Sequence, residues 1–203
     1  MASRMDTMGL KALEVRWRPT PRLLASRLRR AEGQDLTYAE VGATDGSLPS
    51  AGYCQIALST IVGSGEEAFH RLADALLRWE LQRAAGLVVT ASSAAVTPGC
   101  TVLNATPGRL ALLAPCRVVY VLEGSRQRGF AYGTLPGHPL SGEELFGVEL
   151  DAADHVILRI VSFSRPCGPA RLAPGLARAG QRAVNRTYVA TARRLAAGPT
   201  LVR

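Results

Sequence analysis

The chain has 203 residues, of which 47% are apolar and 20% are charged, and its formal net charge is +8. This composition is that of an ordinary globular protein, and the length is typical of one domain. No apolar run approaches the roughly 20 residues of a membrane span. Charged residues interrupt the N-terminal segment, so it lacks the apolar core of a secretory leader. We therefore expect a cytoplasmic protein without a transmembrane segment.

The positive charge comes almost entirely from arginine, because Lys11 is the only lysine. No zinc finger, helix-turn-helix or aromatic RNA-binding strand accompanies the arginines, so we expect an acidic ligand or partner rather than sequence-specific nucleic-acid binding. The cysteines form no CxxC pair and the histidines form no HxH or HExxH pattern, which predicts buried thiols and no metal site. P-loop, GxGxxG and GxSxG motifs are missing as well, so no cofactor is expected.

The first predicted element is a short basic helix over residues 21–32. Pro19 and Pro21 stand at its start and Gly33 follows its end, which is the usual asymmetry of helix boundaries. Two β-type runs follow, at residues 36–41 and 53–62, with turn-forming residues between them.

A longer helix is predicted over residues 65–85. Ser64 and Glu67 have the S-x-x-E spacing of a capping box, in which the serine side chain bonds an otherwise unpaired amide. Gly86 supplies a C-terminal stop. Apolar residues repeat at intervals of three and four and form one face of this helix: Phe69, Leu72, Leu76, Leu77 and Leu81.

From residue 87 to residue 163 the pattern changes to short apolar segments separated by turn residues, which is typical of an antiparallel meander. One hairpin is expected to turn at residues 123–127. A final helix is predicted over residues 170–197, with Pro174 near its start and Gly198 after its end. Its basic face carries Arg178, Arg182, Arg186, Arg193 and Arg194.

These elements predict an α+β fold in which a curved antiparallel sheet of about six or seven strands grips the long C-terminal helix, after N-terminal helical segments. We expect residues 1–33 to form an N-terminal arm and a short basic helix, and residues 34–198 to form a single domain. A sheet that grips a helix commonly leaves a cavity between the two, and such a cavity is the default small-molecule site.

Several segments resemble one bacterial and plant family of unknown function. The hallmark of that family is the string YGTLPGHPxSGEE followed by FSRP, and this chain contains GFAYGTLPGHPLSGEELFGVEL and then SFSRP. LTYAEVGAT, LPSAGY and QRAVNRTY also match, in order, between about residues 36 and 192. The resemblance implies the helix-grip superfamily, which includes START-like and birch-pollen-allergen-like proteins. Residues 34–198 would then be a helix-grip domain.

The segment 129–150 holds the candidate catalytic residues. His138 can serve as an acid or base near neutral pH, and Glu144 or its neighbour Glu143 can orient it or take the complementary role. Tyr132 can donate a hydrogen bond to a developing oxyanion. The alternative is an ordinary polar turn, in which the histidine only bonds the backbone where the chain reverses.

Strand alternation gives Glu144 an internal position if Phe146, two residues later, points into the core. A buried carboxylate needs a partner, and Arg117, Arg165 and His138 are the candidates.

The predicted ligand-binding set combines three kinds of side chain. Arginines would hold a carboxylate or phosphate, and small polar residues at a tight turn would offer backbone amides. Aromatic residues would form a wall of the pocket, although core packing is the alternative for them. The set is Arg117, Arg165, Trp79, Tyr188, Thr134 and Ser141.

The favoured function is the binding of a small hydrophobic or amphipathic molecule between the sheet and the C-terminal helix. One alternative is an enzyme in the same cavity, of cyclase, dehydratase or isomerase type, that acts on a polyketide-like or isoprenoid-like substrate. A third hypothesis is an interaction module whose basic helix faces dock an acidic partner or a membrane surface. A binding protein requires a cavity with few polar groups, whereas the enzyme also requires His138 and Glu144 to point into it.

Overall fold

A computed structural model of the protein describes residues 14–172 and 174–198, and at residues 174 and 176–178 it describes the backbone alone. The first 13 residues of the predicted N-terminal arm, and the side chain of Arg178, lie outside the described part. The strands are β1 (Val15–Trp17), β2 (Cys54–Ser64), β3 (Val88–Ala91), β4 (Thr101–Ala105), β5 (Leu110–Glu123), β6 (Gln127–Thr134), β7 (Leu140–Leu150) and β8 (His155–Pro166). The α-helices are α1 (Pro21–Glu32), α2 (Glu66–Leu77), α3 (Glu80–Ala84) and α4 (Pro174–Ala197), and the 3-10 helices are η1 (Ala43–Asp45) and η2 (Gly168–Leu172).

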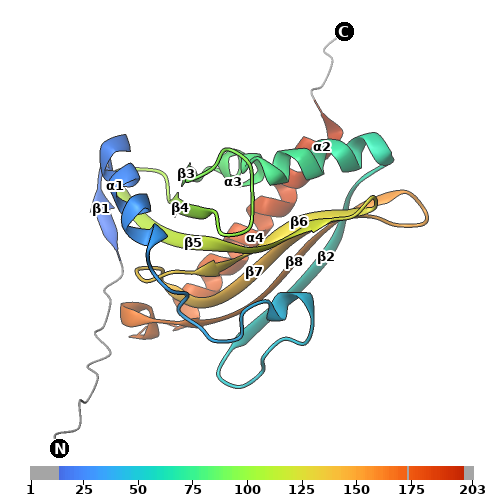
Figure 1. Ribbon diagram of the computed structural model, residues 1–203. Helices are drawn as coiled ribbons and strands as arrows, with labels where there is room; N and C mark the ends of the chain where they lie inside the picture. Colours follow the sequence, from blue (N-terminus) through green and yellow to red (C-terminus); the bar gives the residue numbers. More distant parts are fainter. Residues whose placement is uncertain (1–13, 173, 199–203) are drawn as a thin grey trace, which may run out of the picture.

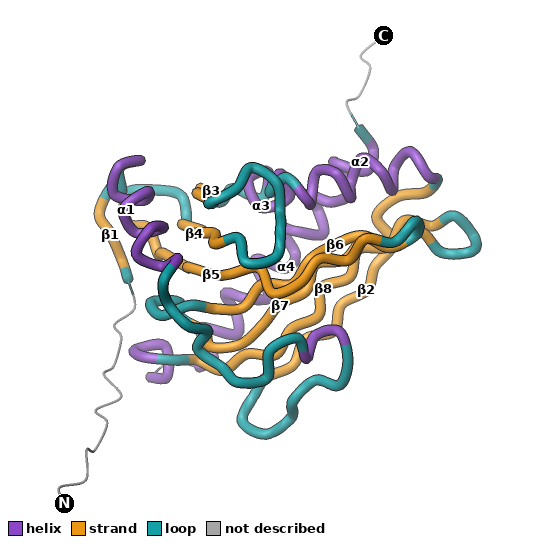
Figure 2. The backbone as a smooth tube through the Cα atoms, viewed as in Figure 1, coloured by secondary structure: helices purple, strands orange, loops and turns teal. Residues whose placement is uncertain are grey.

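The strands form one antiparallel sheet in the order β2-β8-β7-β6-β5-β4-β3, and β1 pairs with the beginning of β5. Strands β3 to β8 follow one another as a meander, which confirms the predicted sheet. The hairpin between β5 and β6 turns within the expected segment. Helices α2 and α4 pack on one face of this curved sheet (Figure 1). The loop that contains η1 contacts β7 and β8 on the other face (Figure 2). The α+β fold of a sheet gripping the C-terminal helix is therefore confirmed.

The main core lies between the sheet and the helices α2 and α4. Large aromatic side chains fill it: the Trp79 and Phe130 rings are 5.2 Å apart, and the Phe146 and Tyr188 rings are 5.0 Å apart. Because all four rings are buried, this part of the space between sheet and helix is packed solid.

The predicted helix over residues 65–85 is wrong as a single element, because the chain breaks between α2 and α3. Trp79 adopts a left-handed backbone conformation with φ of 65°, which no continuous α-helix allows. The break turns the indole ring into the core, where its Nε1–H donates to the Ser93 carbonyl oxygen (3.2 Å). Burial of a large aromatic side chain outweighs the backbone strain of about 1–2 kcal/mol.

The predicted capping box is also wrong. Gly65 is the N-cap residue of α2, with φ of 85° and no side-chain cap. Ser64 instead ends β2, where it pairs with His155, and the Gly65 N–H donates to the Asp154 carbonyl oxygen. The turn between strand and helix needs a positive φ, which glycine adopts without steric cost.

A second small core joins the N-terminal segment to the sheet. Leu24 and Leu28 of α1 are buried against Leu103 of β4 and Leu113 of β5. The domain boundary at residue 33 stays a prediction. Within the described residues, no helix combines the length and apolar character that a bilayer crossing requires.

Candidate functional site

The two adjacent glutamates of the SGEEL segment point to opposite faces of the sheet. Glu144 pairs with Tyr132 of β6 and with Ser162 of β8, on the inner face that α4 covers. Glu143 pairs with Gly133 and Phe163, on the outer face. This separation follows from the two-residue period of a strand, and it gives the two carboxylates different surroundings.

Glu143 anchors the segment 38–44 to the outer face. Only 2% of Glu143 is exposed, and its carboxylate accepts four hydrogen bonds. Oε2 accepts from the Tyr38 hydroxyl (2.7 Å) and the Gly42 N–H (2.8 Å). Oε1 accepts from the N–H (3.1 Å) and the hydroxyl (2.5 Å) of Thr44. Burial and this carboxylate raise the pKa of Tyr38 far above its usual range.

These contacts explain why the predicted strand at residues 36–41 is wrong. The Tyr38 side chain lies over Gly133, where an added Cβ would stand 2.1 Å from the Tyr38 hydroxyl oxygen. Two residues that were predicted to bind a ligand, Ser141 and Thr134, hold this segment on the sheet. The Ser141 hydroxyl donates to the Thr37 carbonyl oxygen (2.9 Å), and the Thr37 N–H donates to the Thr134 carbonyl oxygen (3.0 Å). Side chains of the sheet and the backbone carbonyl of Thr134, rather than a continuous strand partner, thus satisfy the polar backbone groups of this loop.

On the inner face, a small cavity of about 50 Å³ brings the three predicted catalytic residues together. We call it the chamber. Its lining consists of Tyr132, Thr134, His138, Leu140, Gly142, Glu143, Glu144, Ser162, Ser164 and Gln181. The volume suffices for a water molecule or for one functional group of a larger ligand.

Glu144 and Tyr132 form the polar centre of the chamber. The Tyr132 hydroxyl donates to Glu144 Oε2 (3.2 Å). Burial raises the pKa of Glu144 to about 7, because desolvation disfavours the charged carboxylate more than the Tyr132 hydrogen bond favours it. The Ser162 hydroxyl is buried nearby and has no hydrogen-bond partner in the described part of the chain. The chamber therefore contains a carboxyl group that keeps its proton to a higher pH than an exposed glutamate does.

His138 has a turn-stabilising contact of the kind expected from the alternative interpretation. The Leu140 N–H and the Leu140 carbonyl oxygen both lie 3.0 Å from its Nδ1, so Nδ1 accepts from the former or donates to the latter according to the tautomer. Burial lowers the pKa of His138 to about 4, although its backbone contact with Leu140 opposes the shift. At neutral pH the ring is therefore uncharged, and its Nε2 donates or accepts a hydrogen bond according to the tautomer.

The two arginines predicted to partner Glu144 lie elsewhere. Arg117 pairs with Gly133 on the outer face, and its guanidinium donates to the carbonyl oxygen of Glu32 (2.7 Å) at the end of α1. Arg165 is exposed, and its guanidinium carbon lies 4.9 Å from the centre of the Tyr53 ring. The partner of Glu144 is Tyr132 rather than a cation.

The predicted aromatic wall residues lie in the main core. Trp79 is fully buried against Phe130. Tyr188 is buried against Phe146, and burial raises the pKa of its hydroxyl far above the usual range. Among the described residues, neither lines the chamber or the larger cavity next to it.

That larger cavity, which we call the cleft, has a volume of about 650 Å³ and lies between edge strand β2 and the middle of α4. Its lining consists of Cys54, Gln55, Ile56, Ala57, Leu58, Gln181, Arg182, Asn185, Arg186, Val189, Ala190 and Arg193. Gln181 lines the chamber as well, so the two cavities adjoin at this side chain. The basic face of α4 was evident from the sequence, but no pattern in the sequence predicted that this face lies beside β2.

One residue of the cleft has an unsatisfied polar group. Asn185 is only 7% exposed, and its Oδ1 has no hydrogen-bond partner among the described residues. Buried polar groups in proteins are usually paired, so this oxygen is available to a donor that enters the cleft. Sequence reasoning missed Asn185 because an asparagine within a basic helix carries no distinctive signal.

Solved structures with little sequence identity share this fold. An uncharacterised protein from Rhizobium leguminosarum has a TM-score of 0.52 at 8% identity, over 72% of this chain and 96% of that one. Ara h 8.0201 has a TM-score of 0.51 at 9% identity, over 72% of this chain and 100% of that one. The di-domain ARO/CYC BexL from the BE-7585A biosynthetic pathway has a TM-score of 0.51 at 11% identity, over 73% of this chain and 51% of that one. At these identities the likeness concerns the fold alone.

Sequence relatives are found in a bacterium and a plant. A UPF0548 protein from Deinococcus radiodurans is 35% identical over 187 residues, which cover 84% of this chain and 92% of that protein. A UPF0548 protein from Arabidopsis thaliana is 33% identical over 112 residues, or 52% of this chain and 55% of that protein. Residues 37–191 match the family described as Domain of unknown function (DUF1990). The resemblance seen in the YGTLPGHPLSGEE and SFSRP segments is thereby confirmed: the chain belongs to the DUF1990 family, and its fold is of the helix-grip type.

Proposed function

We propose that the protein binds a small amphipathic anion in the cleft between β2 and α4. The observation that carries this proposal is the cleft itself, whose volume of about 650 Å³ lies within the usual range for ligand sites, roughly 300–1,000 Å³. Its wall is apolar on one side, where Ile56 and Leu58 of β2 face Val189 of α4. These half-buried side chains would gain stabilisation when an apolar ligand covers them.

The polar groups of the cleft favour a ligand with a negative charge and a hydrogen-bond donor. Arg182, Arg186 and Arg193 line it and would attract a carboxylate, sulfonate or phosphate. The buried Asn185 Oδ1 would accept a hydrogen bond from a hydroxyl or amide group of the ligand. A hydroxylated carboxylic acid with an apolar body combines these features. We also propose a cytoplasmic location, with which the four free cysteines agree.

The test uses 8-anilinonaphthalene-1-sulfonate, a fluorescent probe with an apolar body and one negative charge. We expect the wild-type protein to bind it and Val189→Trp, which places a bulky indole ring in the cleft, to lose at least about tenfold in affinity. Arg193→Gln removes a positive charge from the cleft and should weaken binding about threefold or more, in the range of a solvent-exposed ion pair. Arg194→Gln is the matched control, since Arg194 is adjacent and exposed but does not line the cleft. Equal affinities for all four proteins would overturn the proposal.

The chamber supports a second candidate function, an enzyme that moves a proton to and from a ligand. The specific observation is Glu144, whose pKa of about 7 suits both donation and acceptance of a proton at neutral pH. Tyr132 and, in its Nε2–H tautomer, His138 would stabilise negative charge on a carbonyl oxygen that enters the chamber. Because the chamber holds only one functional group, the body of such a substrate would lie in the adjoining cleft.

This second function predicts faster proton exchange at the carbon next to a ketone. Cyclohexanone in D2O serves as the probe, and NMR measures its deuterium uptake. Wild type and Glu149→Gln should both accelerate the uptake above the rate in buffer, whereas Glu144→Gln should not. Uptake at the buffer rate with the wild-type protein, or an equal rate for Glu144→Gln, would exclude this role of Glu144.

A further inference from the structure

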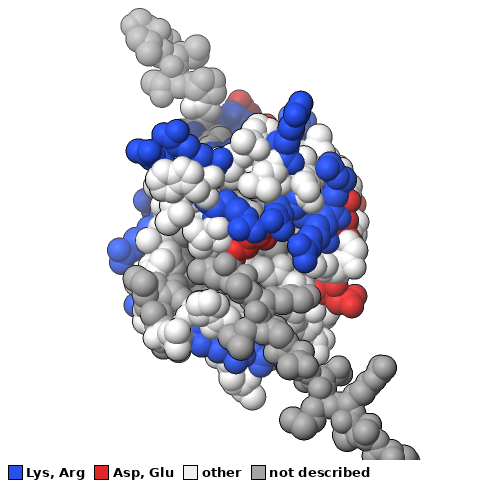
Figure 3. Space-filling model, turned by 90° about the vertical axis from the view of Figure 1, so that its left-hand side faces the viewer, with Lys and Arg blue, Asp and Glu red and all other residues white. Residues whose placement is uncertain are grey.

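A separate cavity of about 380 Å³ lies on the other side of the turn that carries His138. It is enclosed by β1, α1, the middle of β5 and the Pro136–Gly137 turn, and we call it the arginine pocket. Figure 3 shows that basic side chains gather on the face of the molecule that carries α1 and β1. The arginine pocket shares no lining residue with the cleft or the chamber.

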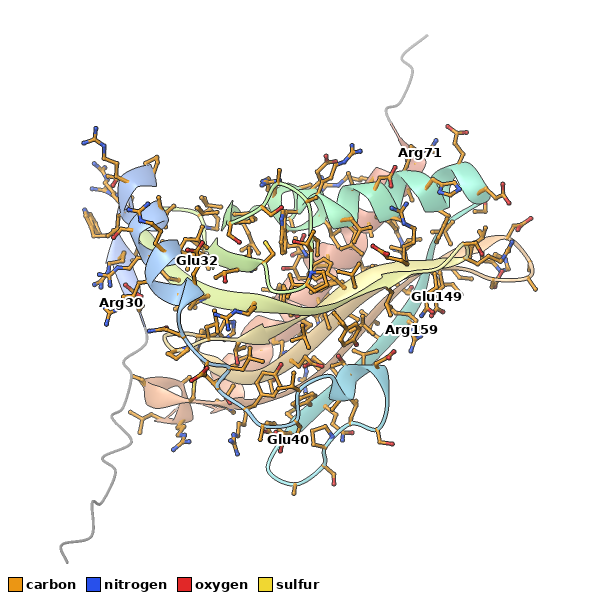
Figure 4. All side chains as sticks on the ribbon, viewed as in Figure 1. Arg30, Glu32, Glu40, Arg71, Glu149 and Arg159 are labelled. Atoms are coloured by element: carbon orange, nitrogen blue, oxygen red, sulfur yellow. The ribbon has the colours of Figure 1, made fainter. Side chains whose placement is uncertain are left out.

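The arginine pocket has an excess of positive charge. Arg16, Arg27 and Arg30 line it together with a single carboxylate, that of Glu14, so three positive charges face one negative charge. Glu14 Oε1 accepts a hydrogen bond from Arg16 Nη2 (2.9 Å), and it forms an ion pair with Arg27 Nε at 2.9 Å. Arg30 has no ion-pair partner within the described residues. The nearby Glu32 side chain projects from the opposite side of α1 (Figure 4). A net charge of two positive therefore remains in the pocket.

One donor of the arginine pocket is buried without an acceptor. Arg16 Nε has no hydrogen-bond partner in the part of the chain that the structure describes, although the atom is shielded from solvent. A buried charged donor without a partner costs free energy, and rotation of the Arg16 guanidinium toward an anion in the pocket would remove that cost. β1 fixes this geometry, because pairing of Arg16 with Ala111 of β5 turns the arginine away from the exposed Trp17.

We propose that the arginine pocket binds the phosphate group of a small phosphorylated molecule. A phosphate monoester carries about 1.5 to 2 negative charges at neutral pH, which matches the net charge of the pocket better than one carboxylate does. The planar guanidinium fork can donate two parallel hydrogen bonds to phosphate oxygens, and three arginines line this pocket. The volume also admits a small organic group beside the phosphate. This proposal does not depend on ligand binding in the cleft.

Phosphate can reach the pocket as a soluble monoester or as a lipid headgroup, so the experiment uses both. Glycerol 3-phosphate is titrated while the backbone amide NMR signals of Gln34 and Gly137, two lining residues, are followed. Vesicles with and without phosphatidic acid are tested by co-sedimentation. Each assay compares wild type with Arg30→Ala and with Arg29→Ala. Arg29 is the matched control, since it is exposed on the same helix and does not line the pocket.

We expect Arg30→Ala to weaken binding at least about fivefold, because this variant loses a direct contact with the phosphate. Arg29→Ala should weaken binding less than about twofold, because Arg29 does not line the pocket. If the two variants differ in this way in the glycerol 3-phosphate titration, the result supports a soluble phosphorylated ligand. If they differ in this way only in the vesicle assay, the result supports a phospholipid headgroup. The proposal is overturned if neither probe binds, or if both variants weaken binding equally, since binding would then reflect only the general basic surface.

Discussion

The buried carboxylate of Glu143 provides the sharpest test of how the two adjacent glutamates, Glu143 and Glu144, differ in their roles. Replacement of Glu143 by Gln keeps the shape and one acceptor oxygen, but it places an NH2 group against two donors. Whichever way the amide turns, its NH2 group faces a backbone N–H that cannot accept, either that of Gly42 or that of Thr44, whereas the hydroxyl of Tyr38 or Thr44 can turn and accept. Each hydrogen bond to a charged group contributes about 1.5–3 kcal/mol, so the loss of one bond and the weakening of the other three to neutral bonds should lower the free energy of unfolding by about 3–5 kcal/mol.

Urea denaturation followed by circular dichroism measures this loss. Glu149→Gln is the matched control, because Glu149 is on the same strand but half-exposed, in an ion pair with Arg159 (2.6 Å), as Figure 4 shows. Ion pairs of this kind contribute about 1 kcal/mol or less. If Glu143→Gln destabilises the protein no more than Glu149→Gln does, the assignment of Glu143 as the anchor of segment 38–44 is refuted.

Three further predictions concern stability. Glu144 keeps its proton up to about pH 7 in the folded protein, whereas the unfolded chain loses it near pH 4.5. The buried carboxyl group therefore lowers the free energy of unfolding progressively as the pH rises through this range. Glu144→Gln should therefore match wild type near pH 4.5 and exceed its stability by up to about 3 kcal/mol near pH 8, and a pH-independent difference in urea denaturation would contradict this. Gly133→Ala should cost about 2 kcal/mol or more in the same assay, because the new methyl group collides with Tyr38, whereas Gly147→Ala, which meets only Arg159 Cβ at 3.7 Å, should cost less than about 1 kcal/mol. A fragment of residues 34–203 should still unfold cooperatively but with several kcal/mol less stability, since it loses the apolar cover of α1, and a fragment without a cooperative transition would refute the predicted domain boundary.

The sequence predicted the sheet well because its signals are local. Turn residues at regular spacing determine where each strand of a meander ends, and neighbouring strands in the chain then pair. The break at Trp79 was not predictable in this way. Its helical pattern continues through the break, and only the aromatic core around Phe130 decides that the side chain must turn inward.

The candidate site was predicted in part. The alternation of the strand after Ser141 placed Glu144 inward, and the structure groups it with Tyr132 and His138 in the chamber. The outward role of Glu143 depends on Tyr38, which is distant in sequence, and no local pattern connects the two. The cleft likewise depends on how α4 lies beside β2, so that Asn185 becomes part of a site only in three dimensions.

The central claim, that the cleft holds an amphipathic anion, is tested most directly by native mass spectrometry of wild type and Val189→Trp side by side. Each protein is measured freshly purified and after incubation with 8-anilinonaphthalene-1-sulfonate. We expect the wild type to carry one small anionic molecule per chain in at least the incubated sample, and Val189→Trp to carry none. A wild-type protein free of adduct in both samples, or an adduct that Val189→Trp retains, would contradict the claim.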